Sequence, residues 1–173
     1  MKLFMGCILA ASLFPAMGAV ASHKADTRHE IQDNYHRFTS AETSKQYERI
    51  KKVTDSFFAP DFVLKLPSGK SLTHAEFLHE MELTCGELRT VSENAFHPRS
   101  IVAQSGKIVE NGIYILAASQ TDPDGNYGAV GLVHNIKETR TYQSTWALAD
   151  GHWRLQSTQI LSVTRVVDGK PHK

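Results

Sequence analysis

Hydrophobic side chains recur at helical spacing near the start of the chain. In residues 26–38, Ile31, Tyr35 and Phe38 follow one another at intervals of four and three, which predicts a helix with one apolar face. The polar segment 39–44 contains two possible capping boxes, in which a threonine precedes a glutamate or glutamine by three residues. We therefore expect the first helix to stop there and a second to begin.

The second predicted helix leads into a short strand. Its apolar positions continue to about Ser56, and Pro60 is expected to end it, because proline interrupts helical hydrogen bonding. Residues 61–66 are predicted to be extended. Pro67 to Lys70 supply a proline and a glycine for a tight turn.

A third helix has the clearest start signal in the chain. Thr73 and Glu76 form a capping box, and Leu72 and Phe77 stand where a hydrophobic staple would place them. We expect this helix to run over 74–85 and to end at Gly86.

The pattern changes after residue 88. Four long segments are rich in Val, Ile, Thr, Tyr and Trp, which favours strands. Ser105-Gly106 and Asp150-Gly151 are typical of tight hairpin turns. The four segments are 88–103, 107–119, 138–149 and 152–166.

The segments outside these strands are rich in polar residues and glycine. Residues 120–137 are expected to form an extended hairpin tip or a mobile flap, and the polar end, 168–173, is expected to fray. Helices followed by an antiparallel sheet predict an α+β domain. A strongly curved sheet enclosed by about three helices is cone-shaped and leaves a pocket at one end.

The amino terminus is expected to be removed. A lysine at position 2, an apolar run over 3–20 and small residues up to Ala21 are typical of a secretory signal peptide, and Pro15 and Gly18 disfavour a membrane anchor. Cleavage near Ala21 predicts a secreted or periplasmic protein without a membrane segment. We expect residues 22–173 to form one domain, with its core in 26–166.

The charge balance argues against nucleic-acid binding, and the cysteine count argues against a disulfide within the mature chain. Nineteen basic and eighteen acidic residues give a net charge of +1, so the chain lacks the basic surface expected for nucleic-acid binding. After removal of the leader only Cys85 remains, which excludes an internal disulfide. Cys85 is expected either to be buried or to be available to a partner.

The sequence resembles the nuclear transport factor 2-like superfamily, and in particular its SnoaL-like and ketosteroid-isomerase-like branch. The resemblance rests on three stretches, covering roughly residues 26–164: IQDNYHRF, FFAPDFVLKLPSGKSLTHAEFLHEM and TYQSTWALADGHWRLQSTQI. It implies a cystatin-like cone, in which three helices enclose a curved antiparallel sheet, and a homodimer formed through that sheet. Members of this superfamily act as isomerases, dehydratases or cyclases, bind ligands, or serve as assembly modules.

Of two catalytic residues of ketosteroid isomerases, the resemblance finds a counterpart here for one and not for the other. Tyr35 stands where ketosteroid isomerases carry a first-helix tyrosine that donates to an oxyanion. Their general-base aspartate precedes a proline-x-glycine turn, and here that position is Leu66. Leucine cannot accept a proton, so the resemblance does not support isomerase chemistry by that route.

Five residues are candidates for the pocket lining, each of which has a structural alternative. Tyr35 is expected to point inward from the first helix, and His74 to face the pocket mouth from the start of the third. Strand alternation places Tyr142 and Trp146 on one face, and Gln159 is assigned to the pocket from the last strand. The alternative is a plain core or dimer-face residue, or, for His74, an exposed residue at the first turn of its helix.

Two histidine-containing patterns have spacings that could hold a metal ion. His29, Asp33 and His36 share one side of a helix at spacings of four and three. Glu76 and His79 form a Glu-x-x-His step, but a di-iron site needs two. We expect solvated helix faces at both, with no metal and no cofactor.

These observations favour a secreted domain that binds a small, partly oxygenated apolar molecule. One alternative is a cofactor-independent lyase or isomerase in which Tyr35 polarises an oxygen while a histidine or an aspartate moves the proton. The other is a dimerisation module with a filled pocket. The absent base at Leu66 places binding ahead of catalysis.

Overall fold

The computed structural model describes residues 17–172. The predicted signal peptide therefore lies outside the described residues up to position 16. The helices are α1 (Met17–Thr43), α2 (Tyr47–Phe57) and α3 (His74–Glu87). In the described part of the chain, no helix has the length and apolarity needed to cross a membrane.

The predicted break after residue 38 is wrong, because α1 continues to Thr43. The hydroxyl of Thr39 donates to the carbonyl oxygen of Tyr35 at 3.0 Å, and that of Thr43 donates to the carbonyl oxygen of Thr39 at 2.8 Å. Both threonines therefore bond back along the helix instead of capping a new one. Lys45, with a φ of 56°, makes the turn into α2.

The start of α3 is as predicted and its end is not. The Thr73 hydroxyl accepts from the backbone N–H of Glu76, and the Glu76 carboxylate accepts from the backbone N–H of Thr73 at 2.8 Å, which completes the capping box. Gly86 does not end the helix, which continues to Glu87.

One seven-stranded sheet follows the order β2-β1-β6-β5-β4-β3, with β7 paired to β6. All of its pairings are antiparallel except that of β1 with β6, so the sheet is mixed and not purely antiparallel as predicted. No hairpin connects these two distant segments, and their relative direction is therefore free of that constraint. The strands are β1 (Phe58–Lys65), β2 (Ser71–Thr73), β3 (Leu88–Gln104), β4 (Lys107–Thr121), β5 (Val133–Ala149), β6 (His152–Val167) and β7 (Lys170–His172).

Pairs of residues with positive φ mark three tight turns between strands, two of them predicted and one not. Ser105-Gly106 and Asp150-Gly151 have positive φ at both residues and make the two predicted hairpins. Asp168-Gly169 does the same, so the tail expected to fray pairs with β6 as β7. Within 120–137, only 122–132 lie outside strands, and the Asp122 carboxylate accepts two backbone N–H groups of this tip.

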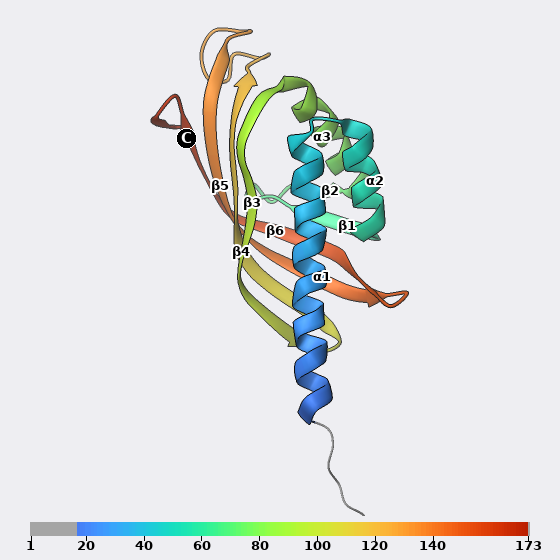
Figure 1. Ribbon diagram of the computed structural model, residues 1–173. Coiled ribbons are helices and arrows are strands. Elements are labelled where there is room, and N and C mark those ends of the chain that lie inside the picture. The colour runs from blue at the N-terminus through green and yellow to red at the C-terminus, as the bar shows by residue number, and fades with distance from the viewer. Residues whose placement is uncertain (1–16, 173) are drawn as a thin grey trace, which may run out of the picture.

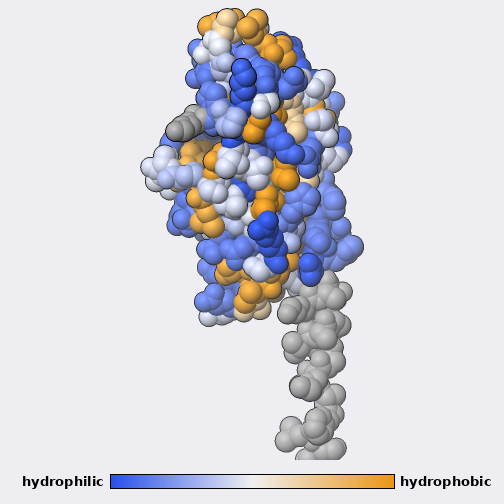
Figure 2. All heavy atoms as spheres, turned by 90° about the vertical axis from the view of Figure 1, so that its left-hand side faces the viewer, coloured by the Kyte–Doolittle hydropathy of each residue, from blue (hydrophilic) through white to orange (hydrophobic). Residues whose placement is uncertain are grey.

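The helices lie on one side of the curved sheet, with α1 running along it (Figure 1). This is the predicted α+β cone. Its hydrophobic core lies between the two layers and includes Ile31, Phe38, Ile50, Phe57 and Trp146. The sheet face turned away from the helices carries hydrophilic and hydrophobic side chains interspersed (Figure 2).

Candidate functional site

A cavity of about 80 Å³ lies between the helices and the concave face of the sheet. This is several times the roughly 10–15 Å³ that one water molecule requires on the same measure, so a small organic molecule of several heavy atoms fits. Most of the lining is aromatic or aliphatic, and six phenylalanines contribute to it: Phe38, Phe57, Phe58, Phe62, Phe77 and Phe96.

Behind this lining lies a fully buried carboxylate, that of Glu110 on β4. The Tyr35 hydroxyl donates to its Oε2 at 2.9 Å, and the Tyr142 hydroxyl donates to its Oε1 at 2.6 Å. The indole N–H of Trp146 also donates to Oε2, at 2.9 Å. Three donors from α1 and β5 therefore converge on one acidic group.

A glycine makes this convergence possible. Gly112 follows Glu110 on the same face of β4, and a Cβ atom added there would lie 2.5 Å from the Tyr142 hydroxyl oxygen and 2.7 Å from its Cζ. Real Cβ contacts are not this short. The missing side chain at position 112 therefore gives the Tyr142 phenol the space through which it reaches Glu110.

The Glu110 carboxylate is a hydrogen-bond acceptor whose two oxygens are both bonded to side chains of the protein. Burial raises the pKa of Glu110 above its usual value, whereas the bonds from Tyr142, Tyr35 and Trp146 lower it. Burial and the nearby Glu110 charge raise the pKa of Tyr35 well above its usual range. Because each phenol already donates to Glu110, neither proton is free for a ligand.

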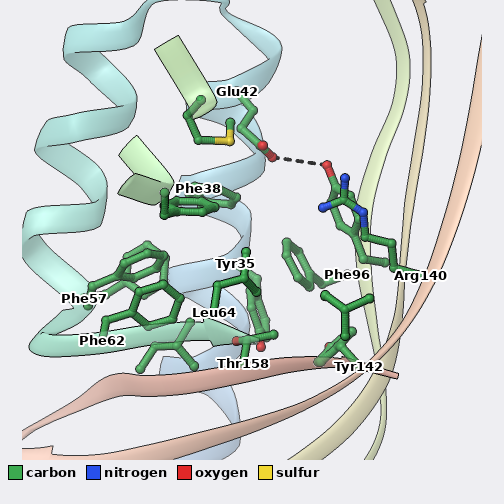
Figure 3. Close-up of a pocket in the computed structure, with 16 residues that line it drawn as sticks. Tyr35, Phe38, Glu42, Phe57, Phe62, Leu64, Phe96, Arg140, Tyr142 and Thr158 are labelled. Atoms are coloured by element: carbon green, nitrogen blue, oxygen red, sulfur yellow. Dashed lines mark hydrogen bonds between the residues drawn. The ribbon is translucent and has the colours of Figure 1, made fainter. Parts of the chain in front are cut away.

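The other polar part of the cavity is formed by three different elements. Glu42 comes from α1, Tyr114 from β4 and Arg140 from β5. The Tyr114 hydroxyl donates to Glu42 Oε2 over a long 3.4 Å, and the Asn94 amide donates to the same oxygen at 3.1 Å. Figure 3 shows Glu42 and Arg140 on one side of the cavity and Phe57 and Phe62 on the other. We call Glu42, Tyr114 and Arg140 the polar end.

The electrostatics of the polar end differ from those around Glu110. Burial raises the pKa of Glu42 to about 7, against the Asn94 hydrogen bond and the Arg140 charge, which lower it. The Arg140 guanidinium lies 5.5 Å from the centre of the Tyr114 ring and donates through Nε to Glu138. Glu42 is therefore a carboxyl group that exchanges its proton near neutral pH at the wall of a cavity.

The structure brings three of the five predicted pocket residues together. Tyr35 and Tyr142 line the cavity. Trp146 is fully buried next to them, with its ring centre 5.4 Å from that of Tyr35, and it contacts Glu110 outside the set of lining residues.

Gln159 and His74 lie elsewhere. Gln159 is exposed because an extra residue, Gln156, bulges from β6 opposite β5, which moves Thr158 and Ile160 onto the cavity face instead. His74 lies in a separate open groove with Asp55, and its ring is tilted by 50° against the Phe58 ring, with 5.2 Å between ring centres. Burial lowers the pKa of His74, whereas Asp55 raises it.

The metal candidates do not assemble in the described residues. Nε2 of His29 lies 3.5 Å from Asp33 Oδ2, both side chains are exposed, and His36 is exposed as well. Glu76 is engaged in the capping box of α3. Across 17–172, no group of three or more His, Cys, Asp or Glu side chains is placed to hold a metal ion.

Sequence reasoning missed the two carboxylates that matter most. Glu110 alternates with Ile108 and Tyr114 on one face of β4, so an acidic residue on the apolar side of an amphipathic strand was the available signal. Glu42 lies seven residues after Tyr35, which is two helical turns along the same face, but its spacing from Thr39 predicts half of a capping box instead. Leu66 is half-buried against the core.

The sequence matches no family model and no curated protein, whereas several solved structures share its architecture. An NTF2-like protein from Cytophaga hutchinsonii has a TM-score of 0.56 at 16% identity, covering 78% of this chain and 97% of its own. A type 2 hexachlorocyclohexane dehydrochlorinase (LinA) has a TM-score of 0.59 at 12% identity, covering 84% and 93%. A putative dehydratase of the NTF2-like family from Streptomyces avermitilis has 0.55 at 10% identity, covering 79% and 95%. Together with the curved sheet and its three helices, these likenesses show that the chain has the nuclear transport factor 2-like fold.

Proposed function

We propose that this protein binds a small apolar molecule that carries one polar group. The observation that supports this most directly is the polar end, in which Glu42, Tyr114 and Arg140 open onto an otherwise apolar cavity. A core that served stability alone would gain from apolar side chains at these positions, because buried charges are costly to desolvate. An apolar wall with a few polar groups at one end is typical of ligand pockets.

The state of Tyr35 supports binding ahead of catalysis. An oxyanion donor must have its hydrogen bond free for the substrate, and the Tyr35 hydroxyl already donates to Glu110. Tyr142 is committed to the same carboxylate. Both phenols therefore contribute ring surface to the cavity, while their hydroxyl groups hold Glu110.

A lyase or isomerase activity of the SnoaL-like kind is the second candidate, and Glu42 is the residue that favours it. A carboxyl group with a pKa of about 7 accepts and releases a proton at neutral pH. Two structures of the same fold are described as a dehydrochlorinase and a putative dehydratase, although a shared fold does not decide function. Deuterium incorporation into cyclohexanone in D₂O tests this candidate: it predicts exchange above buffer that Glu42→Gln abolishes.

Titration calorimetry with benzyl alcohol, a one-ring compound with a single hydroxyl, tests the binding proposal. We expect measurable binding to the wild type and at least tenfold weaker binding to Met81→Trp, because the larger side chain fills the cavity that Met81 lines. Leu83→Trp is the matched control, since Leu83 lies on the same helix and is 51% exposed. No binding to any of the three would contradict the proposal and favour the filled dimerisation module.

We also propose that the mature protein is a secreted or periplasmic homodimer. The leader-like residues up to Ala21 support export. A second copy would cover the outer face of the sheet, where β4 places the half-buried Val109, Ile113 and Ile115. Native mass spectrometry of the exported protein tests both parts: we expect a chain shortened by about 21 residues, at twice the monomer mass.

A further inference from the structure

The net charge at the polar end is set by two arginines and two glutamates. Arg140 and Arg165 both contact the buried carboxylate of Glu138, the first through Nε and the second through Nη2 and Nε at 2.9 Å. These three groups together carry one net positive charge. Glu42 decides the balance, because the cluster is neutral when Glu42 is ionised and carries +1 when Glu42 is protonated.

Arg140 retains hydrogen-bonding capacity toward the cavity. Its Nε is used by Glu138, whereas its two terminal nitrogens donate to no protein atom in the described part of the chain. The guanidinium lines the cavity and points into it (Figure 3). Two parallel N–H groups of a guanidinium match the two oxygens of a carboxylate.

Among the described residues that line the cavity, Glu42 is the only one with a carboxyl group. The groups that face it are Arg140 from β5, Tyr114 from β4, Asn94 from β3 and Cys85 from α3, and Glu138 is paired with Arg140. An anion on Arg140 would meet the Glu42 charge unless Glu42 takes up a proton. Once protonated, Glu42 can donate its own O–H to the incoming oxygen.

We propose, building on the binding function above, that the ligand is a small apolar monocarboxylic acid held by Arg140, and that Glu42 takes up one proton when the ligand anion binds. The ring or alkyl part lies among the phenylalanines. A single negative charge matches the single positive charge left when Glu42 is neutral, which disfavours a phosphate dianion. The raised pKa of Glu42 supports this coupling, since the proton is gained at little cost near neutral pH.

The first test compares benzoate with benzyl alcohol by calorimetry on the wild-type protein between pH 6 and pH 8. One proton taken up by a group that titrates near pH 7 weakens benzoate binding about tenfold over this range, and benzyl alcohol binding stays constant. In Glu42→Gln we expect benzoate affinity to lose its pH dependence. Benzoate affinity that is constant with pH in the wild type would overturn the proposal.

The second test removes the guanidinium. Arg140→Gln should weaken benzoate binding at least tenfold more than it weakens benzyl alcohol binding, because only the carboxylate pairs with the guanidinium charge. Arg154→Gln is the control, because Arg154 bonds to backbone carbonyls of Asp55 and Ser56 and lies outside the cavity lining. If Arg140→Gln does not fold, as judged by circular dichroism, the wild-type pH series still decides.

The two proposals fail in different ways. If benzyl alcohol binds and benzoate does not, or binds equally well at both pH values, the carboxylic acid proposal is wrong and the binding function stands. If neither compound binds, the binding function itself is contradicted.

Discussion

Two buried carboxylates, Glu110 and Glu42, lie on the inner side of the same cone and differ in how many hydrogen bonds they accept. Glu110 is 0% exposed and accepts three hydrogen bonds, two of them from phenols. Glu42 is 8% exposed, accepts one amide hydrogen bond of 3.1 Å and one long contact of 3.4 Å, and lines the cavity. The Phe96 ring packs against a phenol of each group, with 4.1 Å between its centre and that of Tyr35 and 4.7 Å to that of Tyr114. A carboxylate whose acceptors are saturated holds structure together, whereas one with few partners is available to a ligand.

The largest effect is expected from removing the saturated carboxylate. Glu110→Ala leaves three buried donors without an acceptor and opens a void, so we expect a loss of about 4 kcal/mol in the free energy of unfolding. Glu110→Gln keeps the shape but replaces one acceptor oxygen with a donor, and should lose about 2 kcal/mol. Urea unfolding measures both. Losses below about 1 kcal/mol for both variants would show that this cluster is not structural.

The second-largest effect is a dependence of the unfolding free energy on pH that comes from Glu42. The folded-state pKa of Glu42 is about 7, above the usual 4.5. Between pH 4.5 and pH 7, therefore, Glu42 keeps its proton in the folded protein and has lost it in the unfolded chain. Stability from this group is therefore present below pH 4.5 and is lost as the pH rises to about 7. The shift corresponds to at most about 3 kcal/mol.

Comparing wild type with Glu42→Gln isolates this contribution, because other titrating groups, Glu110 included, are common to both proteins. We expect the difference in unfolding free energy between them to change across pH 4.5–7 and to be constant above about pH 8. A difference that is flat over the whole range would mean that the pKa of Glu42 is the same in the folded and unfolded states.

The fold of this protein is readable from local patterns, whereas the site depends on contacts between distant segments. The Thr73–Glu76 capping box and the Asp150-Gly151 turn are set by neighbouring residues, and both are found as predicted. Simple alternation predicts Gln159 on the cavity face, but a bulge at Gln156, the fifth residue of β6, reverses the phase. No local pattern reports such a bulge.

Glu110 and Glu42 illustrate the same limit in the site. The hydrogen bond from Tyr35 to Glu110 joins residues 75 positions apart, and that from Tyr114 to Glu42 joins residues 72 apart. An acidic residue on the apolar face of a strand signals that something must satisfy it, but the sequence does not name its partners. Those partners decide which carboxylate is structural and which is available.

The third effect tests how the Glu110 group is accommodated. Gly112→Ala should cost about 2 kcal/mol, because the new methyl group displaces the Tyr142 phenol or the backbone around the His97 carbonyl, whose oxygen would be 2.8 Å away. Gly86→Ala is the matched control. Gly86 is helical with open space around it, so alanine there should stabilise the protein by up to about 1 kcal/mol. Equal effects at both glycines would contradict the close approach of Tyr142.

The smallest effect compares single hydroxyl groups at the two carboxylates. Tyr35→Phe removes one of the three bonds to Glu110 and keeps the ring stacked on Phe96, so it should cost about 1 kcal/mol in thermal unfolding experiments. Tyr114→Phe removes only the 3.4 Å contact with Glu42 and should cost less than about 0.5 kcal/mol. The two variants should also differ in their affinity for benzoate. Tyr114→Phe removes a hydroxyl group next to the proposed position of the ligand carboxylate and should alter that affinity. Tyr35→Phe removes a hydroxyl group that already donates to Glu110 and should leave it unchanged. The reverse order in both measurements would place the available carboxylate at Glu110 and the structural one at Glu42.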